Sequence, residues 1–283
     1  MKNYISKKSI ARVIYHVFTF LFACVMIYPL LWMVMGSFKN TAEIFKSAAT
    51  LLPSAFNIEN YTVGWKGFAG YTFAIFFKNS FIIAGISTIG AVFSSAIVSF
   101  GFARCNFKFK GFWFGCMLVA MMLPFQVIMI PQYILFNKMG WVGSYLPIIV
   151  PQFFGQGFFI FLNLQFIKGI PRDLDEAAFM DGCSIYMIFI KIILPLIKPA
   201  LVTSAIFSFM WRWDDFLSPL IYLSDPLKYP VSYALKMFAD PTAGSDWGAM
   251  FAMATLSLLP IFIIFLTMQK YLVEGIASTG IKG

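Results

Sequence analysis

The most chemically active side chains of this sequence lie between Lys168 and Lys198, where the centre reads RDLDEAAFMDG. Asp173 is predicted to cap the N-terminus of a short helix, and Glu176, three residues later, completes a capping box. Asp175 adds a negative charge at the positive end of the same helix. Gly182 is predicted to end it, because glycine readily takes the left-handed conformation of a C-terminal cap.

This short helix has the features of a docking element for another protein. Pro171 stops the preceding helix, so the new one starts independently. Ala177 and Ala178 are small, and we expect both to let a partner surface approach closely. The segment therefore predicts a rigid, charged helix that fits a groove in a partner.

A second group of charged and aromatic side chains interrupts an otherwise apolar segment. It consists of Trp211, Arg212, Trp213, Asp214, Asp215 and Phe216. Charges in such a segment usually face a protein interior or a water-filled path. One interpretation, which we favour, is a structural ion pair between Arg212 and Asp215; the other is the wall of a translocation path. The aromatic rings suit either the apolar faces of sugars or a membrane-interface belt.

The sequence predicts no metal site, no cofactor and no enzymatic activity. The four cysteines lack C-x-x-C spacing, and His16 is the only histidine. The segment GIASTGIK at residues 275–282 lacks the Ser or Thr that follows the lysine of a P-loop. Neither a GxSxG elbow nor an HExxH pattern occurs.

Composition places the chain in a membrane. Of its 283 residues, 60% are hydrophobic and 12% are charged, whereas soluble domains have about 25% charged residues. Uncharged runs of 23 to 29 residues recur, and about 20 apolar residues cross a bilayer as a helix. We predict an all-α membrane protein with one transmembrane domain over residues 1–283. Its six predicted spans cover residues 10–37, 72–103, 111–137, 143–168, 198–223 and 246–271.

Basic residues set the expected orientation. With a cytoplasmic N-terminus, 13 Lys and Arg fall in inner segments and 7 in outer ones, so the positive-inside rule predicts that both termini are cytoplasmic. The net charge of +9 is then a topology signal and not a nucleic-acid surface. The predicted connections are outer loops at 38–71, partly helical, and 224–245, an inner loop at 169–197 and a cytoplasmic tail at 272–283.

The second span carries a small residue at every fourth position. These residues are Ser87, Ala91, Ser95, Ser99 and Ala103. Such a stripe predicts that another helix approaches closely along this face. Prolines in or beside the spans, Pro124 among them, predict kinks.

The inner loop resembles the EAA loop of ABC importer permeases. That pattern is Glu-Ala-Ala, three residues, Gly, nine residues and Ile-x-Leu-Pro. It matches here at Glu176, Ala177, Ala178, Gly182, Ile192, Leu194 and Pro195. The resemblance implies a coupling helix that sits in a cleft of a cytoplasmic ATPase.

The resemblance extends to the maltose-type branch of sugar permeases. The segments WRWDDFLSPLIYLSD, Trp211–Asp225, and QKYLVEGIASTGIKG, Gln269–Gly283, are similar to that branch, although Arg212 departs from its commoner form. The resemblance implies a type I ABC importer permease fold in the cytoplasmic (inner) membrane of a prokaryote. It also implies a second related permease, two ATPase subunits that bind ATP and Mg²⁺, and an extracytoplasmic solute-binding protein. The loop Tyr222–Asp246 would contact the binding protein, and the tail would contact the ATPases.

The predicted function is import of an oligosaccharide, with the chain as one transmembrane subunit. Because the planar fork of Arg212 suits a carboxylate, an acidic oligosaccharide is a hypothesis. Alternatives are the same architecture for a non-sugar solute, an ion-driven secondary transporter, or a scaffold that docks a soluble partner. An inverted repeat would favour the secondary transporter, and the sequence displays none.

Overall fold

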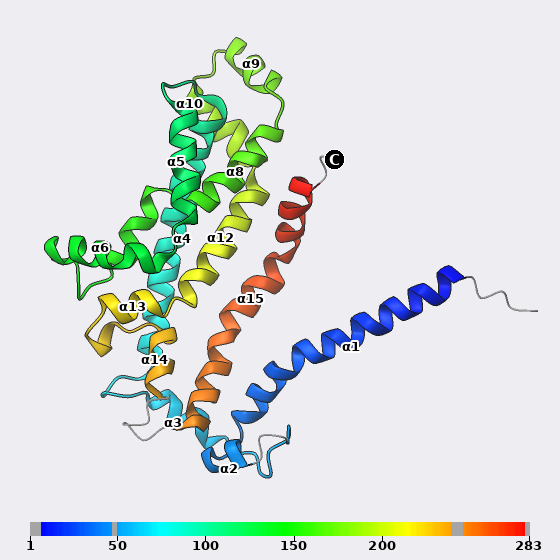
Figure 1. Ribbon diagram of the computed structural model, residues 1–283, viewed down its shortest axis with the longest axis vertical. Coiled ribbons are helices and arrows are strands. Elements are labelled where there is room, and N and C mark those ends of the chain that lie inside the picture. The colour runs from blue at the N-terminus through cyan, green and yellow to red at the C-terminus, as the bar shows by residue number, and fades with distance from the viewer. Residues whose placement is uncertain (1–6, 47–49, 239–245, 281–283) are drawn as a thin grey trace, which may run out of the picture. The chain divides into compact units, whose positions relative to one another are not determined.

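The computed structural model describes residues 7–46, 50–238 and 246–280 (Figure 1). Within these ranges the regular structure is helical and no β-strand occurs. The chain forms two compact units. Unit 1 comprises Met1–Gly67 and Leu235–Leu258, and unit 2 comprises Phe68–Ala234 and Leu259–Gly283.

Unit 1 contains a long apolar helix and several shorter helical segments. They are α1 (Lys7–Gly36), α2 (Thr41–Lys46), α3 (Glu59–Lys66) and the first part of α15 (Trp247–Gly280). The Asn60 side-chain amide donates to the carbonyls of Ser37 and Lys39, at 2.8 Å each. These bonds fix the turn that follows α1. Helices α2 and α3 make the predicted outer loop 38–71 partly helical, as expected.

Unit 2 holds most of the other helices. They are α4 (Phe73–Arg104), α5 (Lys110–Met122), α6 (Phe125–Lys138), α7 (Leu146–Ile149), η1 (Val150–Phe154), α8 (Gly157–Gly169), α9 (Asp173–Met180), α10 (Ile185–Ile188), the π-helix η2 (Phe189–Ile193), α11 (Leu194–Leu196), α12 (Lys198–Trp213), α13 (Leu217–Tyr222) and η3 (Pro226–Lys228). Helix α14 (Val231–Phe238) follows and continues into unit 1.

Hydropathy and length agree with a membrane protein. Among the described residues, four helices are long and apolar enough to cross a membrane: Ile10–Gly36, Phe73–Arg104, Leu146–Gly169 and Trp247–Leu272. Two bent helix pairs also qualify, which gives up to six spans when each pair is counted as one. The all-α membrane fold predicted from the uncharged runs is confirmed.

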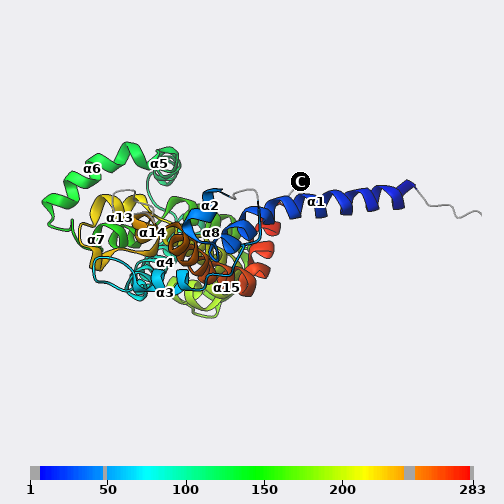
Figure 2. The same ribbon diagram turned by 90° about the horizontal axis from the view of Figure 1, so that it is seen from below.

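The predicted third span is not one straight helix. Helices α5 and α6 meet at an angle of 101°, and Figure 2 shows α6 running across the view beside a nearly end-on α5. The break falls at Leu123, whose backbone is extended, with φ −74° and ψ 121°. The cause is Pro124, because a proline disfavours helical geometry in the residue before it.

The fifth span also differs from its predicted bounds of 198–223. The qualifying pair is Ile185–Leu196 with Lys198–Trp213, bent by 74°, so residues 185–196 of the predicted inner loop are helical and belong to this span. The π-turn in this segment has Leu194 N–H bonded to the carbonyl of Phe189. Pro195 follows directly and lacks an N–H, which removes one bond of a regular helix here.

Helix α4 is the centre of unit 2. It packs against α8, α12 and η1, and Figure 1 shows α4, α8 and α12 side by side. The small residues of the predicted stripe are all buried, at 0–5% exposure. The hydroxyl oxygens of Ser94 and Ser95 accept the amide protons of Gly155 and Gln156, at 3.0 Å each. The predicted close approach is therefore confirmed, within this chain.

Candidate functional site

Helix α9 forms where the acidic segment predicted it, but its N-terminus differs. The helix runs from Asp173 to Met180, Arg172 is the capping residue, and no side chain caps the helix. The predicted capping box from Asp173 to Glu176 is therefore wrong. Arg172 already has helical angles, φ −71° and ψ −21°, so Asp173 lies inside the first turn and lacks the extended backbone of a cap.

The C-terminus of α9 follows the prediction. Gly182 has φ +79°, a conformation that favours glycine. Its N–H donates to the carbonyl of Phe179 at 3.0 Å, and the N–H of Cys183 donates to the carbonyl of Ala178 at 2.9 Å. These two bonds make a Schellman motif, which ends the helix sharply.

Asp175 turns inward and forms an ion pair. Its Oδ2 lies 2.6 Å from Nε of Arg104, and both side chains are about nine-tenths buried. Arg104 is the last residue of α4, and its guanidinium also donates to the carbonyl of Ile170 at 2.8 Å. Sequence reasoning missed this role of Arg104, which was counted only as a basic residue at the end of a span.

The inner face of α9 is joined to the helix bundle. Ala178, at 6% exposure, belongs to an apolar cluster that includes Phe100 and Ile167. The expectation that both alanines face a partner is therefore wrong for Ala178, whereas Ala177 is exposed. Ile192 and Leu194, the second half of the motif, pack half-buried against the same cluster, while Pro195 is exposed.

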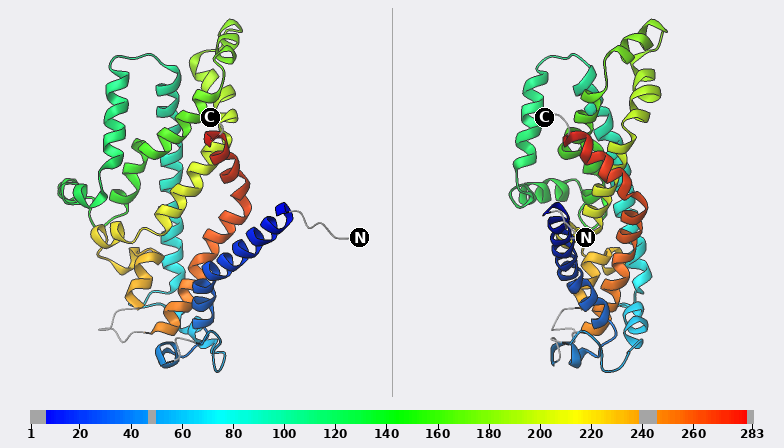
Figure 3. Two further views of the ribbon diagram at one scale, coloured as in Figure 1. Left: turned by 45° about the vertical axis from the view of Figure 1, so that its right-hand side comes forward. Right: turned by 90° about the vertical axis from the view of Figure 1, so that its right-hand side faces the viewer.

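The outer face of α9 is open. Glu176 is exposed, and so are the large apolar side chains of Leu174, Phe179 and Met180, the last at 88%. Figures 1 and 3 show α9 at one end of unit 2, the same end as the loop between α4 and α5. Grouped apolar side chains beside a charge on an exposed helix are typical of a protein–protein contact.

A polar cavity of about 390 Å³ lies elsewhere in unit 2. Of the six residues predicted for a translocation path, Trp211, Arg212 and Asp215 line it. The cavity wall also includes residues that sequence reasoning missed: Gln132, Gln152, Gln156, Ser218 and Tyr222. Their shared signal is a polar side chain within an apolar span, which the sequence offered at Gln132, Gln152 and Gln156.

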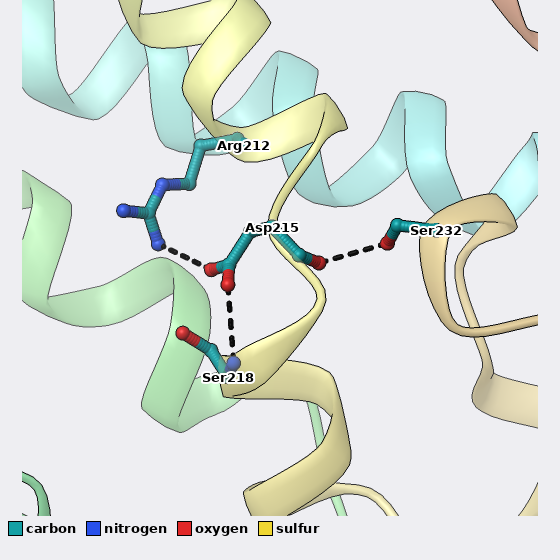
Figure 4. A network of polar contacts seen from close by, with 4 residues as sticks. All are labelled: Arg212, Asp215, Ser218 and Ser232. Carbon is teal, nitrogen blue, oxygen red and sulfur yellow. Dashed lines mark hydrogen bonds and ion pairs between the residues drawn. The ribbon is translucent and has the colours of Figure 1, made fainter. Parts of the chain in front are cut away.

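The predicted ion pair forms at the wall of this cavity. Arg212 Nη1 lies 3.0 Å from Asp215 Oδ2. The other carboxylate oxygen accepts the N–H of Ser218 at the start of α13, at 3.1 Å. The Ser232 hydroxyl donates to the Asp215 carbonyl at 2.8 Å (Figure 4). Asp215 thus holds the break between α12 and α13 together, as the structural interpretation predicted.

The remaining three predicted path residues do not line this cavity. Trp213 is 3% exposed and packs on Phe81, with ring centroids 4.9 Å apart. Phe216 packs on Tyr233 at 5.8 Å. Asp214 is the exposed capping residue at the end of α12. Trp211 and Trp213 lie two positions apart on α12 and point in different directions from the helix axis, so only Trp211 lines the cavity.

The outer loop after α13 is fixed to α4. The Asn79 amide donates to the carbonyls of Leu227 and Tyr229, at 2.8 and 3.0 Å. The Ser80 hydroxyl oxygen accepts the N–H of Val231. Burial, with a hydrogen bond to Tyr233, raises the pKa of Tyr229 to about 12.

Parts of two predicted contact segments lie outside the described residues. These parts are 239–245 of the loop Tyr222–Asp246 and 281–283 of the tail. Up to Gly280 the tail continues helix α15. Within the described ranges, no three His, Cys, Asp or Glu side chains group as metal ligands would.

Several apolar helices, a short helix with an open outer face at one end of unit 2 and a polar cavity between bent helices are the features of a membrane transport subunit. Residues 91–278 match the family "Binding-protein-dependent transport system inner membrane component". The chain belongs to this family of inner-membrane permeases.

Similarity to known permeases extends over nearly the whole chain. A probable ABC transporter permease of Bacillus subtilis is 38% identical over 94% of this chain and 87% of its own length. An arabinooligosaccharide transport permease of the same species is 30% identical over 97% of both. A starch degradation products permease of Thermoanaerobacterium thermosulfurigenes is 30% identical over 90% of this chain and 91% of its own.

A solved structure has the same fold. It is the crystal structure of a bacterial ABC transporter involved in the import of the acidic polysaccharide alginate, and it matches with a TM-score of 0.81. The match covers 95% of this chain and 99% of that chain at 21% identity. The predicted ABC importer permease fold is therefore confirmed.

Proposed function

We propose that this chain is one transmembrane subunit of an ABC importer that carries an oligosaccharide across the cytoplasmic membrane. The observation that carries the proposal is the complete EAA pattern on helix α9, whose inner face is joined to the bundle and whose outer face is open. Family membership supports the importer class. The relatives named for arabinooligosaccharides and starch products support a sugar substrate.

In this proposal α9 is the coupling helix. Its outer face, with Glu176 and Met180, sits in a cleft of a partner ATPase. ATP and Mg²⁺ bind to two such partner subunits and not to this chain. When ATP closes the ATPase pair, α9 is displaced, and the Arg104–Asp175 ion pair transmits the displacement to α4. The helices packed on α4 then move with it, which shifts the population between inward- and outward-open states.

The polar cavity is the proposed part of the translocation path in this subunit. Side-chain amides of Gln132, Gln152 and Gln156 can both donate to and accept from sugar hydroxyls. The indole of Trp211, 47% exposed, offers an apolar face to the C–H side of a sugar ring. Polar groups that converge among apolar and aromatic side chains are typical of small-molecule sites.

An acidic oligosaccharide is a second candidate within the sugar class. Arg212 lines the cavity, and a guanidinium has five N–H donors, of which Asp215 occupies only part. A substrate carboxylate would meet the remaining donors. If Arg212→Ala leaves transport of both acidic and neutral oligosaccharides unchanged, this candidate fails.

The proposed partners follow the family. A second related permease pairs with this chain, and an extracytoplasmic solute-binding protein delivers the sugar. We place its contact at the loop Tyr222–Asp246, whose described part is fixed to α4 through Asn79. The C-terminal tail is the proposed second contact with the ATPases.

The experiment is purification of the tagged full chain in mild detergent, with mass spectrometry of the proteins that accompany it. We expect an ATPase, a second permease and a solute-binding protein, and the sugar bound by the last names the substrate. Reconstituted vesicles then test ATP dependence. A chain that purifies alone and drives uptake with a proton or sodium gradient would contradict the proposal in favour of a secondary transporter. ATP-driven uptake of a non-sugar solute would contradict only the sugar.

A further inference from the structure

A second cavity, separate from the translocation path, lies where α4, α5 and α8 end at the predicted cytoplasmic side. Its volume is about 560 Å³. Four cations line it: Arg104 at the end of α4, Lys110 at the start of α5, Lys168 in the last turn of α8, and Arg172 just before α9. No carboxylate belongs to the described lining.

Three of these cations have no carboxylate partner among the described residues. Arg104 is neutralised by Asp175. Lys110 donates to the carbonyl of Cys105 at 2.9 Å, and Arg172 donates to that of Ala103 at 3.4 Å. Lys168 Nζ lies 5.9 Å from the centre of the Phe114 ring. These contacts hold the side chains at the wall but leave three positive charges uncompensated, so the cavity attracts an anion.

The backbone adds to this attraction. No side chain caps α5 at Phe109, so the first N–H groups of α5 add positive character beside Lys110. Gly111 lines the cavity, and a Cβ there would meet no atom within 4 Å. The anion can therefore approach the start of the helix without steric hindrance.

The rest of the surroundings are apolar and continue along α5. Phe114 and Leu164 line the cavity, and α5 has no buried residue along its 13 positions. The exposed apolar side chains of α5, such as Leu118 and Val119, continue from the cavity along the helix. An anion with an attached apolar chain fits this combination better than a free ion does.

We infer that this cavity binds an anionic phospholipid of the cytoplasmic leaflet, with the phosphate between Lys110, Lys168 and Arg172 and an acyl chain along α5. Basic pockets between transmembrane helices on this side are suited to anionic headgroups. The lipid sits beside Arg104, and so it stabilises the junction at which α4 holds α9.

Native mass spectrometry of the purified full chain tests the inference, with phosphatidylglycerol as the probe and phosphatidylcholine as the neutral comparison. We expect tighter binding of phosphatidylglycerol. The double variant Lys110→Gln, Lys168→Gln should bind it about 30-fold more weakly, because each cation near an anionic lipid contributes about fivefold. Lys110→Arg, Lys168→Arg should restore binding. The control Lys66→Gln, Lys138→Gln removes two exposed lysines elsewhere and should bind as the unaltered chain does.

A second pair of variants keeps the test independent of folding. Gly111→Asp introduces a carboxylate at the cavity wall, and Gly111→Asn is its uncharged match. Only the aspartate should weaken phosphatidylglycerol binding. Equal affinity for both lipids, or no effect of the lysine and aspartate variants, would overturn the inference. Complete displacement of the lipid by millimolar inorganic phosphate would also overturn the inference, because it identifies a free-anion site. Loss of the lipid when a partner ATPase binds would overturn it too, because it identifies a protein contact.

Discussion

Oδ2 of Asp175 on α9 lies 2.6 Å from Nε of Arg104 on α4, although 71 positions separate the two residues in the sequence. The pair is buried, and the same arginine holds the carbonyl of Ile170 just before the short helix. Two contacts from one side chain thus fix both the approach to α9 and its first turn. The proposed coupling helix is therefore attached directly to α4, the longest helix of unit 2, and not only through its flanking loops.

Removal of one charge from this pair should destabilise the chain. Asp175→Asn leaves Arg104 buried without its counter-charge, at a cost of about 3–5 kcal/mol. We expect a lower unfolding temperature in detergent and weaker coupling of ATP hydrolysis to uptake. The double variant Arg104→Gln, Asp175→Asn should regain part of the stability, and Glu59→Gln, an exposed acid on α3, should change neither. An Asp175→Asn chain as stable as the unaltered one would disprove the role of the pair.

Charge reversal on the outer face should affect coupling but not folding. Glu176→Lys changes an exposed residue, so the unfolding temperature should stay the same. Uptake should fall by about tenfold or more, because a reversed charge at a docked surface costs several kcal/mol. ATP hydrolysis and uptake are measured together in reconstituted vesicles. Glu59→Lys, an exposed acid on α3, is the matched control. Normal uptake by the Glu176 variant would remove α9 from the coupling pathway.

The turn at Gly182 should tolerate no side chain well. Its φ of +79° makes Gly182→Ala cost about 1 kcal/mol. Gly182→Pro requires φ near −65° and removes the N–H that bonds Phe179, so it should abolish coupled uptake. Gly169→Ala is the control, because Gly169 lies outside the left-handed region and has open space around it. Unaltered transport by Gly182→Pro would mean that the end of α9 has no coupling role.

Loss of the exposed indole in the polar cavity should weaken substrate handling. Trp211→Ala removes an apolar face from the cavity wall, so we expect a several-fold higher KM for oligosaccharide uptake. Trp113→Ala removes an indole of similar exposure, 55%, from α5 and serves as the control. Equal KM values in the two variants would place the sugar elsewhere, such as in the second permease.

Patterns formed by residues close together in the sequence predicted the structure well. Uncharged runs predicted the membrane helices, and the small residue at every fourth position predicted the buried face of α4. Gly182 predicted the end of α9. Arg212 and Asp215 pair as predicted because they are three positions apart on one chain segment. Local spacing is visible in a sequence, and these features depend on little else.

Features that depend on distant residues were missed. The capping box failed because Arg172 already adopts helical angles, so the helix starts one residue early. Asp175 carries no local sign that its partner lies at the end of α4. The path prediction took six neighbouring residues together, yet the turn of α12 points Trp213 away from the cavity that Trp211 lines. The three glutamines of that cavity come from α6, η1 and the residue before α8, and only folding brings them together.

The sharp bend after α5 has a consequence for the surrounding bilayer. The 13 residues of α5 rise only about 20 Å at 1.5 Å each, whereas a hydrocarbon core is about 30 Å thick. Because α6 then turns by 101°, α5 alone is too short to match that thickness. Lipids beside α5 must thin to fit it or give way to protein at its far end. Hydrophobic mismatch is therefore larger at α5 than at the long helices α4 and α15.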